Sequence, residues 1–119
     1  MENKEFSKIL EARTRIFAIA IIKLSANLPD NIEGKIIRNQ LTGSGTSIGA
    51  NYREANRARS KADFKNKIKI CESETNETGY WLEIIDELKW ITDGESALIR
   101  NEEYELMAIF TSIGKNLQL

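Results

Sequence analysis

The stretch QLTGSGTSIGANYREA, residues 40–55, decides how this chain folds. Its three glycines could form a loop on local grounds, because each glycine inside a helix costs about 1 kcal/mol relative to alanine. A face of apolar and small residues nevertheless passes through the glycines at helical spacing, and it consists of Leu41, Ser44, Ile48, Tyr52 and Ala55. We therefore predict an unbroken helix whose small residues let a neighbouring helix approach closely.

A phosphate-binding loop is the alternative for the glycine-rich part of this stretch. The P-loop pattern ends in glycine, lysine and serine or threonine, because its lysine must reach the phosphates. No lysine follows the glycines at positions 43, 45 and 49. The residues therefore favour close helix packing over phosphate binding.

Helical periodicity continues on both sides of this stretch and predicts four helices, over residues 4–28, 31–59, 60–91 and 96–117. The connections between them are short, which makes consecutive helices antiparallel neighbours. The predicted fold class is all-α, with residues 1–119 forming one domain. Its architecture is an antiparallel up-down-up-down four-helix bundle.

The helix boundaries are predicted from residues that break or cap helices. Pro29 ends the first helix and Asp93-Gly94 ends the third. The second, third and fourth helices begin at the capping residues Asp30, Ser60 and Ser96. The same periodicity directs apolar side chains of the flanking helices into the core, among them Phe6, Ile21, Tyr80, Ile85, Leu98 and Phe110.

The composition excludes several classes of enzyme. The chain has 119 residues, no histidine and one cysteine, Cys71. Without histidine it has no Ser-His-Asp triad, no Cys-His dyad and no imidazole metal ligand, and a single cysteine cannot close an internal disulfide. We expect a protein that is not an enzyme and uses no cofactor or metal, with Cys71 buried as a small apolar side chain.

The chain also lacks the apolar segments that direct proteins to membranes. Its longest apolar run covers residues 16–22, whereas a membrane-spanning helix needs about 20 apolar residues. Its first ten residues carry charges of both signs where a signal peptide has an apolar centre. We expect a cytoplasmic protein with no membrane partner.

The apolar surface of the predicted bundle exceeds what one chain can bury. Residues 16–22 are apolar nearly all round their helix, and Ile19 and Ile22 point away from the inner stripe. Trp90 also falls opposite the inner stripe of its predicted helix. We therefore predict a homo-oligomer with an interface through Ile19, Ile22 and Trp90; isolated surface hydrophobes are the alternative.

Charge is strongly segregated, although 17 basic and 18 acidic residues nearly cancel over the whole chain. Residues 53–69 carry a balance of +5, and residues 72–105 carry a balance of −9. The bundle topology places the positive segment at one end, where it can contact the phosphate backbone of RNA or DNA. The predicted contact residues are Arg53, Arg57, Arg59, Lys61, Lys65 and Lys69. A solvated, salt-bridged surface and a docking surface for a protein partner are the alternatives.

Polar residues at one level of the bundle form a second candidate site. Arg13 falls on the inner face of the first helix, and a buried arginine requires carboxylate partners. We predict an internal polar network with a structural role, made of Arg13, Asn51, Glu54, Glu74 and Glu77. The alternative is a carboxylate metal or acid–base site, but known di-metal bundles use Glu-x-x-His motifs.

Three segments carry a family resemblance: IIKLSANLP (residues 21–29), QLTGSGTSIGANYREA (40–55) and DFKNKIKICESETNETGYWLE (63–83). They resemble the four helix bundle protein family, whose members include proteins encoded in intervening sequences of 23S rRNA genes. The accessory variability proteins of diversity-generating retroelements are a related group. The residues matching the family motif, which we interpret as structural, are Ser44, Ser47, Asn51, Glu54, Glu74, Glu77, Thr78, Tyr80 and Trp81.

The resemblance implies a four-helix protomer that assembles into a homopentamer shaped as a short barrel. Its retroelement relatives associate with nucleic acid and a reverse transcriptase, whereas this chain resembles the intervening-sequence branch more closely. Together with the basic end, this favours a non-enzymatic oligomeric protein that contacts RNA or DNA. The alternative function is a protein–protein interaction scaffold with no nucleic-acid role.

Overall fold

The glycine-containing residues 40–55 are helical throughout and form the greater part of α2 (Ile32–Ala55), as their periodicity predicts. The predicted inner face is confirmed, since all of its members are buried: Leu41, Ser44, Ile48, Tyr52 and Ala55. Two of the glycines lie against α1 (Lys4–Ser25). A Cβ at Gly45 would lie 2.8 Å from Cγ2 of Ile21, and one at Gly49 would lie 3.0 Å from Oγ1 of Thr14. The small residues therefore permit close approach of α1, as predicted.

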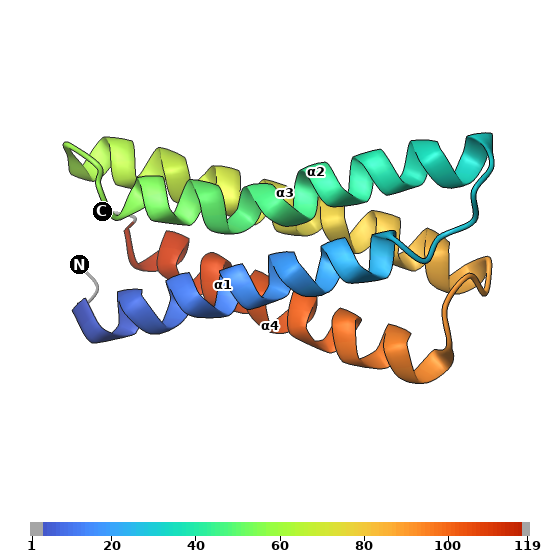
Figure 1. Ribbon diagram of the computed structural model, residues 1–119. Helices are drawn as coiled ribbons and strands as arrows, with labels where there is room; N and C mark the ends of the chain where they lie inside the picture. The colour runs from blue at the N-terminus through green and yellow to red at the C-terminus, as the bar shows by residue number, and fades with distance from the viewer. Residues whose placement is uncertain (1–3, 118–119) are drawn as a thin grey trace.

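Two further helices, α3 (Lys61–Glu87) and α4 (Asp93–Asn116), complete the fold. The structure, a computed structural model, describes residues 4–117. Consecutive helices run in opposite directions through short connections, and residues 4–117 contain no strand (Figure 1). The predicted all-α, up-down-up-down four-helix architecture is confirmed.

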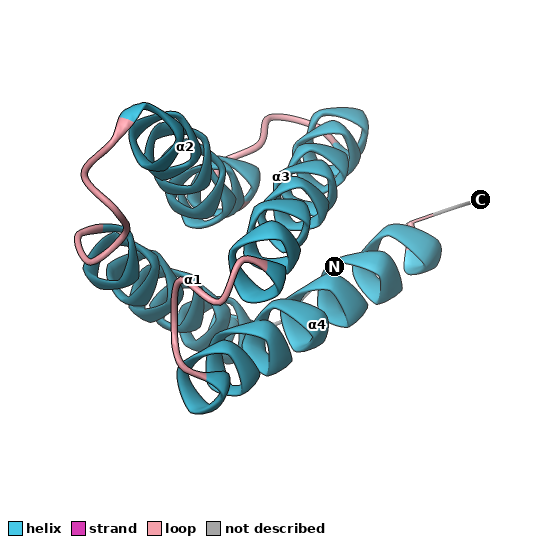
Figure 2. Ribbon diagram, turned by 90° about the vertical axis from the view of Figure 1, so that its right-hand side faces the viewer, coloured by secondary structure: helices cyan, strands magenta, loops and turns pink. Residues whose placement is uncertain are grey.

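The helices do not pack equally closely. α2 contacts α3 most extensively, while α1 and α4, which close the bundle, contact each other over a much shorter length. Figures 1 and 2 show the reason, because α4 is inclined to the other three helices. The main core therefore lies among α1, α2 and α3 and continues between α3 and α4, where Tyr52 of α2 and Phe110 of α4 are in edge-on contact near the ends of their helices.

The inner face of α3 differs from the prediction. Tyr80 is 57% exposed, whereas the buried positions include two threonines, Thr75 and Thr78. Their hydroxyls donate hydrogen bonds to Cys71 O (2.7 Å) and to Oγ of Ser44 (3.0 Å), so burial leaves neither group unsatisfied. A periodicity based only on apolar residues misses such positions. Leu98 of α4 is likewise wrong as a core residue, being 77% exposed.

The end of α3 is also corrected by the structure. The helix stops at Glu87, and not near Ile91, because Lys89 adopts a left-handed backbone conformation with φ of 58°. The amide of Trp90 then donates to Ile85 O (3.2 Å) and that of Lys89 to Asp86 O (3.0 Å), which is the Schellman pattern of helix termination. Trp90 packs against the core instead of projecting outward, so its placement as an outward-facing helical residue was wrong.

The remaining boundaries shift by a few residues. Ser60 caps α3 as predicted, its side chain accepting from the amide of Asp63 (3.0 Å). Thr92 caps α4 in place of Ser96, forming a reciprocal pair of hydrogen bonds with Glu95. Asn31 caps α2 in place of Asp30, and α1 and α2 end at Ser25 and Ala55, before the predicted positions 28 and 59.

None of the four helices within residues 4–117 is long and apolar enough to cross a membrane.

Candidate nucleic-acid interface

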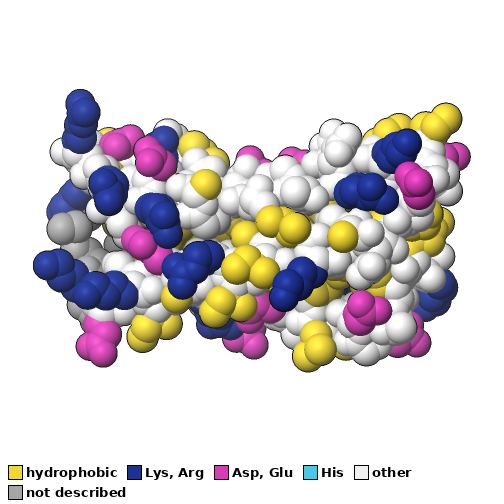
Figure 3. All heavy atoms as spheres, viewed as in Figure 1, with side chains coloured by type: hydrophobic (Ala, Val, Ile, Leu, Met, Phe, Trp, Pro, Cys, Tyr) yellow, Lys and Arg dark blue, Asp and Glu magenta, His cyan; other side chains and the backbone are white. Residues whose placement is uncertain are grey.

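Cations from several elements gather at one end of the bundle. The topology brings together the start of α1, the end of α2, the start of α3 and the end of α4, and in Figure 3 dark blue side chains cover this end at the left. Most of the predicted contact residues are exposed and Lys65 is half-buried. The structure therefore presents the following side chains on one end: Arg53, Arg57, Arg59, Lys61, Lys65 and Lys69.

Few of these charges are neutralised locally. Arg53 pairs weakly with Glu11 of α1, with Nε 3.9 Å from Oε1, and the other Glu11 oxygen accepts from Asn56 (2.8 Å). The other five predicted contact residues make no ion pair with any residue of 4–117. A group of cations without carboxylate partners produces a positive potential in the surrounding solvent. Among the predicted contact residues, Arg53 alone forms a salt bridge with a residue of 4–117, so the alternative to a nucleic-acid interface is a solvated surface.

The start of α1 adds to this end. Lys4 and Lys8 are exposed there and make no ion pair with the described residues. Phe6, which the periodicity assigns to the core, is 38% exposed on the same turns of the helix. The basic end therefore carries an exposed aromatic ring at Phe6, where the sequence pattern predicts a core residue.

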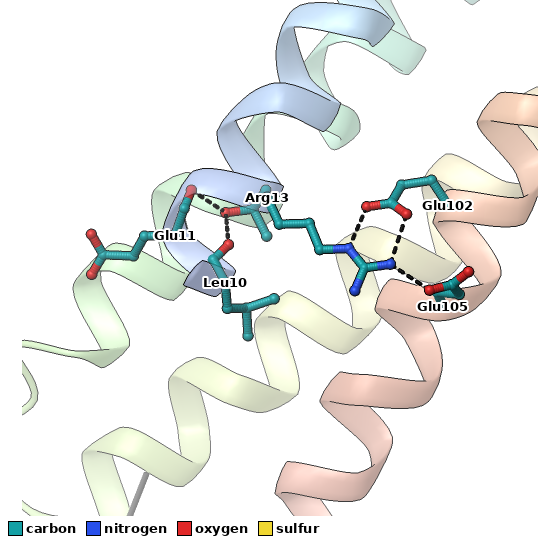
Figure 4. Close-up of polar contacts among 6 residues, drawn as sticks. Leu10, Glu11, Arg13, Glu102 and Glu105 are labelled. Atoms are coloured by element: carbon teal, nitrogen blue, oxygen red, sulfur yellow. Dashed lines mark hydrogen bonds and ion pairs between the residues drawn. The ribbon is translucent and has the colours of Figure 1, made fainter. Parts of the chain in front are cut away.

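Arg13 does not belong to the predicted polar network. Its side chain reaches across to α4, where Nε donates to Oε2 of Glu102 (2.6 Å) and Nη2 to Oε1 of the same residue (2.8 Å), as Figure 4 shows. Nη2 also donates to Oε1 of Glu105 (2.5 Å). These two carboxylates raise the pKa of Arg13 above its ordinary value. The next residue, Thr14, takes the fully buried position on this part of α1.

The other members of that network make separate local contacts. Asn51 donates to Ser47 O (2.8 Å), and Glu77 accepts from the indole of Trp81 (3.1 Å), while Glu54 is exposed. Glu74 is half-buried, and burial together with the nearby Glu77 raises its pKa. The predicted internal network was therefore wrong. Helix periodicity gives the face on which a residue lies but not the partner that its side chain reaches.

In the described part of the chain, the carboxylates form no metal site and the thiol is not set up as a nucleophile. Across residues 4–117, no three aspartate, glutamate or cysteine side chains come together as metal ligands would. Cys71 is buried, as predicted, and donates to Ile48 O (3.6 Å). Burial raises the pKa of Cys71 to about 12, so the reactive thiolate is scarce at neutral pH.

Comparison with known proteins identifies the family of the chain. The model of a family described as 23S rRNA-intervening sequence protein matches residues 8–112. This chain belongs to that family. No curated protein matches it.

A solved structure from Bacteroides thetaiotaomicron is similar to this intervening-sequence protein. That structure is described as a protein with unknown function from the S23 ribosomal protein family. The two chains are 38% identical, the match covers 92% of this chain and 97% of the other, and the TM-score is 0.84. Neither comparison indicates an enzyme family.

Four of the motif residues behind the family resemblance make hydrogen bonds with one another in this intervening-sequence protein. Ser44 and Thr78 join α2 to α3 through a buried hydrogen bond, and Glu77 holds the indole of Trp81. The candidate interface uses other residues, which lie at the basic end.

An exposed apolar stripe lies on the outer face of α1. Ile19 and Ile22, two of the predicted interface residues, are 45% and 49% exposed, and Ile9 and Ile16 are exposed earlier on the same helix. In Figure 3 hydrophobic side chains cluster along the middle of this face. The single chain therefore leaves Ile19 and Ile22 open to solvent, as their helical spacing predicts.

Proposed function

We propose that this intervening-sequence protein is a non-enzymatic oligomeric protein that binds the phosphate backbone of RNA or DNA through its basic end. The observation that supports this most directly is the group of unpaired cations around the α2–α3 connection: Arg57, Arg59, Lys61, Lys65 and Lys69. Lysine and arginine that neutralise phosphates release counterions, which makes binding tight at low salt.

The binding depends on the backbone and shape of the nucleic acid more than on its base sequence. Base recognition uses hydrogen bonds in a groove or aromatic rings that stack on bases, and the exposed aromatic at this end is Phe6. The similar Bacteroides protein is placed in a ribosomal protein family by its description, which supports RNA as the nucleic acid.

Oligomerisation uses the apolar stripe of α1. Burying Ile19 and Ile22 against other copies would remove apolar surface from water, at about 25 cal/mol per Å². A pentamer, which the family resemblance implies, would repeat the basic end five times around one axis. Several weak electrostatic contacts would then act together on one nucleic acid.

Charge reversal tests the nucleic-acid proposal. The double variant Arg57→Glu/Lys65→Glu should weaken binding to a structured RNA by more than tenfold in low salt, measured by fluorescence anisotropy. The slope of log K against log salt should also become shallower by about 1 for each phosphate contact removed.

A matched control lies at the opposite end of the bundle. Lys23→Glu/Lys35→Glu changes the net charge by the same amount, at exposed sites near the α1–α2 connection. The control should bind almost as the unmodified protein does. Equal losses in both double variants would show that only net charge matters and would refute a basic-end interface.

A protein scaffold is the second candidate, favoured by the exposed isoleucines of α1. Size-exclusion chromatography with light scattering distinguishes self-association through this stripe from the docking of a different protein. If α1 joins copies of this chain, Ile19→Ser/Ile22→Ser should reduce the oligomer to a monomer. A wild-type monomer at micromolar concentration would instead leave the stripe free for a different protein.

A further inference from the structure

A shallow groove of about 260 Å³ lies between α3 and α4, away from the basic end. It is lined on the α3 side by Gly79, Tyr80 and Glu83, and on the α4 side by Arg100, Glu103 and Tyr104. Tyr80 and Tyr104 are more than half exposed. The sequence patterns did not predict this groove, because its residues come from two helices and the motif residue among them, Tyr80, is interpreted as structural.

Glu103 is the unusual residue of the groove. It is only 5% exposed, yet its carboxylate makes no hydrogen bond or ion pair with any residue in 4–117. Buried carboxylates in proteins are normally paired, because leaving one without a partner is costly. The lining position of Glu103 means that a molecule in the groove can supply the missing partner.

The space around this carboxylate depends on Gly79. A Cβ at position 79 would lie 2.8 Å from Oε1 of Glu103 and 2.9 Å from its Cδ, so any side chain there would displace the carboxylate from its present position. Glycine therefore lets the Glu103 carboxylate lie against the backbone of α3 at the floor of the groove.

Arg100, the nearest cation, is partly bound elsewhere, and its Nε is buried without a hydrogen-bond partner in residues 4–117. Its Nη1 donates to Oδ2 of Asp86 (3.1 Å), its Nη2 donates to the hydroxyl of Tyr104 (2.8 Å), and its guanidinium lies 5.7 Å from the centre of the Tyr104 ring. Asp86 thus neutralises Arg100, and the groove keeps the negative charges of Glu83 and Glu103. Burial raises the pKa of Glu103 and Arg100 opposes that rise, as expected for a carboxylate without a direct partner.

We propose that the α3–α4 groove binds a monovalent organic cation, an alkylammonium or guanidinium group, with Glu103 as its counter-ion and Tyr80 and Tyr104 at its sides. A charged N–H donor would give the carboxylate its missing hydrogen bond, and aromatic rings attract such cations. The cation comes either from a free small amine or from a lysine or arginine side chain of a second copy of this chain. The proposal does not depend on nucleic-acid binding.

Titration with ethylguanidinium tests the site directly. The amide NMR signal of Gly79 should shift with a saturable curve in the wild type and in Glu87→Gln, an exposed carboxylate variant at the end of α3. In Glu103→Gln, which keeps the shape and removes the charge, binding should weaken at least tenfold. Ethylurea, the neutral analogue, should produce no saturable shift.

A second variant keeps the charge and removes the space. Gly79→Ala places a methyl group against the Glu103 carboxylate and should weaken binding of ethylguanidinium as well. Circular dichroism shows whether each variant retains its helices, so the conclusion does not depend on one substitution.

Sedimentation velocity separates the two sources of the cation. If a second copy supplies it, Glu103→Gln should weaken self-association where Glu87→Gln does not, and ethylguanidinium should compete with assembly. If a free amine occupies the groove, only the titration should respond to Glu103. The proposal is overturned if neither the titration nor the assembly differs between Glu103→Gln and Glu87→Gln.

Discussion

Glycines of α2 have different roles at neighbouring positions. A side chain at Gly45 would meet Ile21 of α1, whereas one at Gly43 would find no atom within 4 Å. Ile21 is fully buried and β-branched, so it has little freedom to move aside. The sequence predicts that these small residues mark a close approach, but only the packed structure distinguishes the glycine that is required from the one that is not.

Gly45→Ala should destabilise the protein by about 1–2 kcal/mol, because overpacking against Ile21 outweighs the gain in helix propensity. Gly43→Ala should stabilise it by up to about 1 kcal/mol, since only the propensity changes. Urea unfolding followed by circular dichroism measures both. Equal stabilisation by the two substitutions would contradict the close contact between α1 and α2.

The buried carboxylate of Glu103 should make stability depend on pH. Burial raises its folded pKa above the ordinary value of 4.5, so the folded state holds the proton more tightly than the unfolded state. Stability therefore falls as the pH rises from about 4.5 through the folded pKa. Glu103→Gln removes this loss, and its stability advantage over the wild type should be larger at about pH 7 than at about pH 4.

Urea unfolding at the two pH values measures this difference, with Glu87→Gln as the control for losing one carboxylate. A Glu103→Gln advantage that is the same at both pH values would show that burial does not perturb this group.

At the scale of helices, a boundary is predicted correctly where a residue type that usually caps or ends helices occupies it. Ser60 begins α3 because a serine before the helix can accept the Asp63 amide. The end of the same helix was mispredicted because Lys89 occupies the left-handed position that glycine normally fills in a Schellman motif. With no glycine there, the apolar periodicity continues through Trp90 and Ile91, and the helix appears longer than it is.

Lys89→Gly should stabilise the protein by about 0.5–1 kcal/mol, because glycine adopts the left-handed conformation without the steric cost of a side chain. The exposed ion pair between Lys89 and Asp93 contributes too little to reverse this gain. Thermal and urea unfolding provide the measurement. Leu88→Gly, one residue earlier in a helical conformation, should destabilise instead, and a loss in both variants would contradict the assigned helix end.

At the scale of the whole molecule, α4 is the least symmetrically packed helix. It contacts α3 along much of its length but meets α1 over a short region, where Arg13 joins Glu102 and Glu105 (Figure 4). Helical periodicity placed Arg13 on an inner face but could not name these partners, since the inclination of α4 decides which side chains it can reach. The polar connection therefore depends on the packed arrangement of helices.

Arg13→Gln should lower the free energy of unfolding by about 1 kcal/mol, since charge-assisted hydrogen bonds to partly exposed carboxylates are lost. Hydrogen exchange should accelerate in α4 more than in α2, because the bonds join α4 to α1. Lys23→Gln, on the exposed side of α1, is the control. Uniform acceleration throughout the chain would mean that Arg13 supports the whole fold equally.

The sequence by itself determines the four helices, their order, the inner face of α2, the burial of Cys71 and the gathering of cations at one end. These features follow from spacing and topology, because neighbouring turns and short connections leave few alternatives. Only the tertiary structure decides the partners of Arg13, the packing of Trp90 against the core and the groove around Glu103. Each of these depends on the angle and separation of two helices, which result from packing over their whole length and not from any single residue.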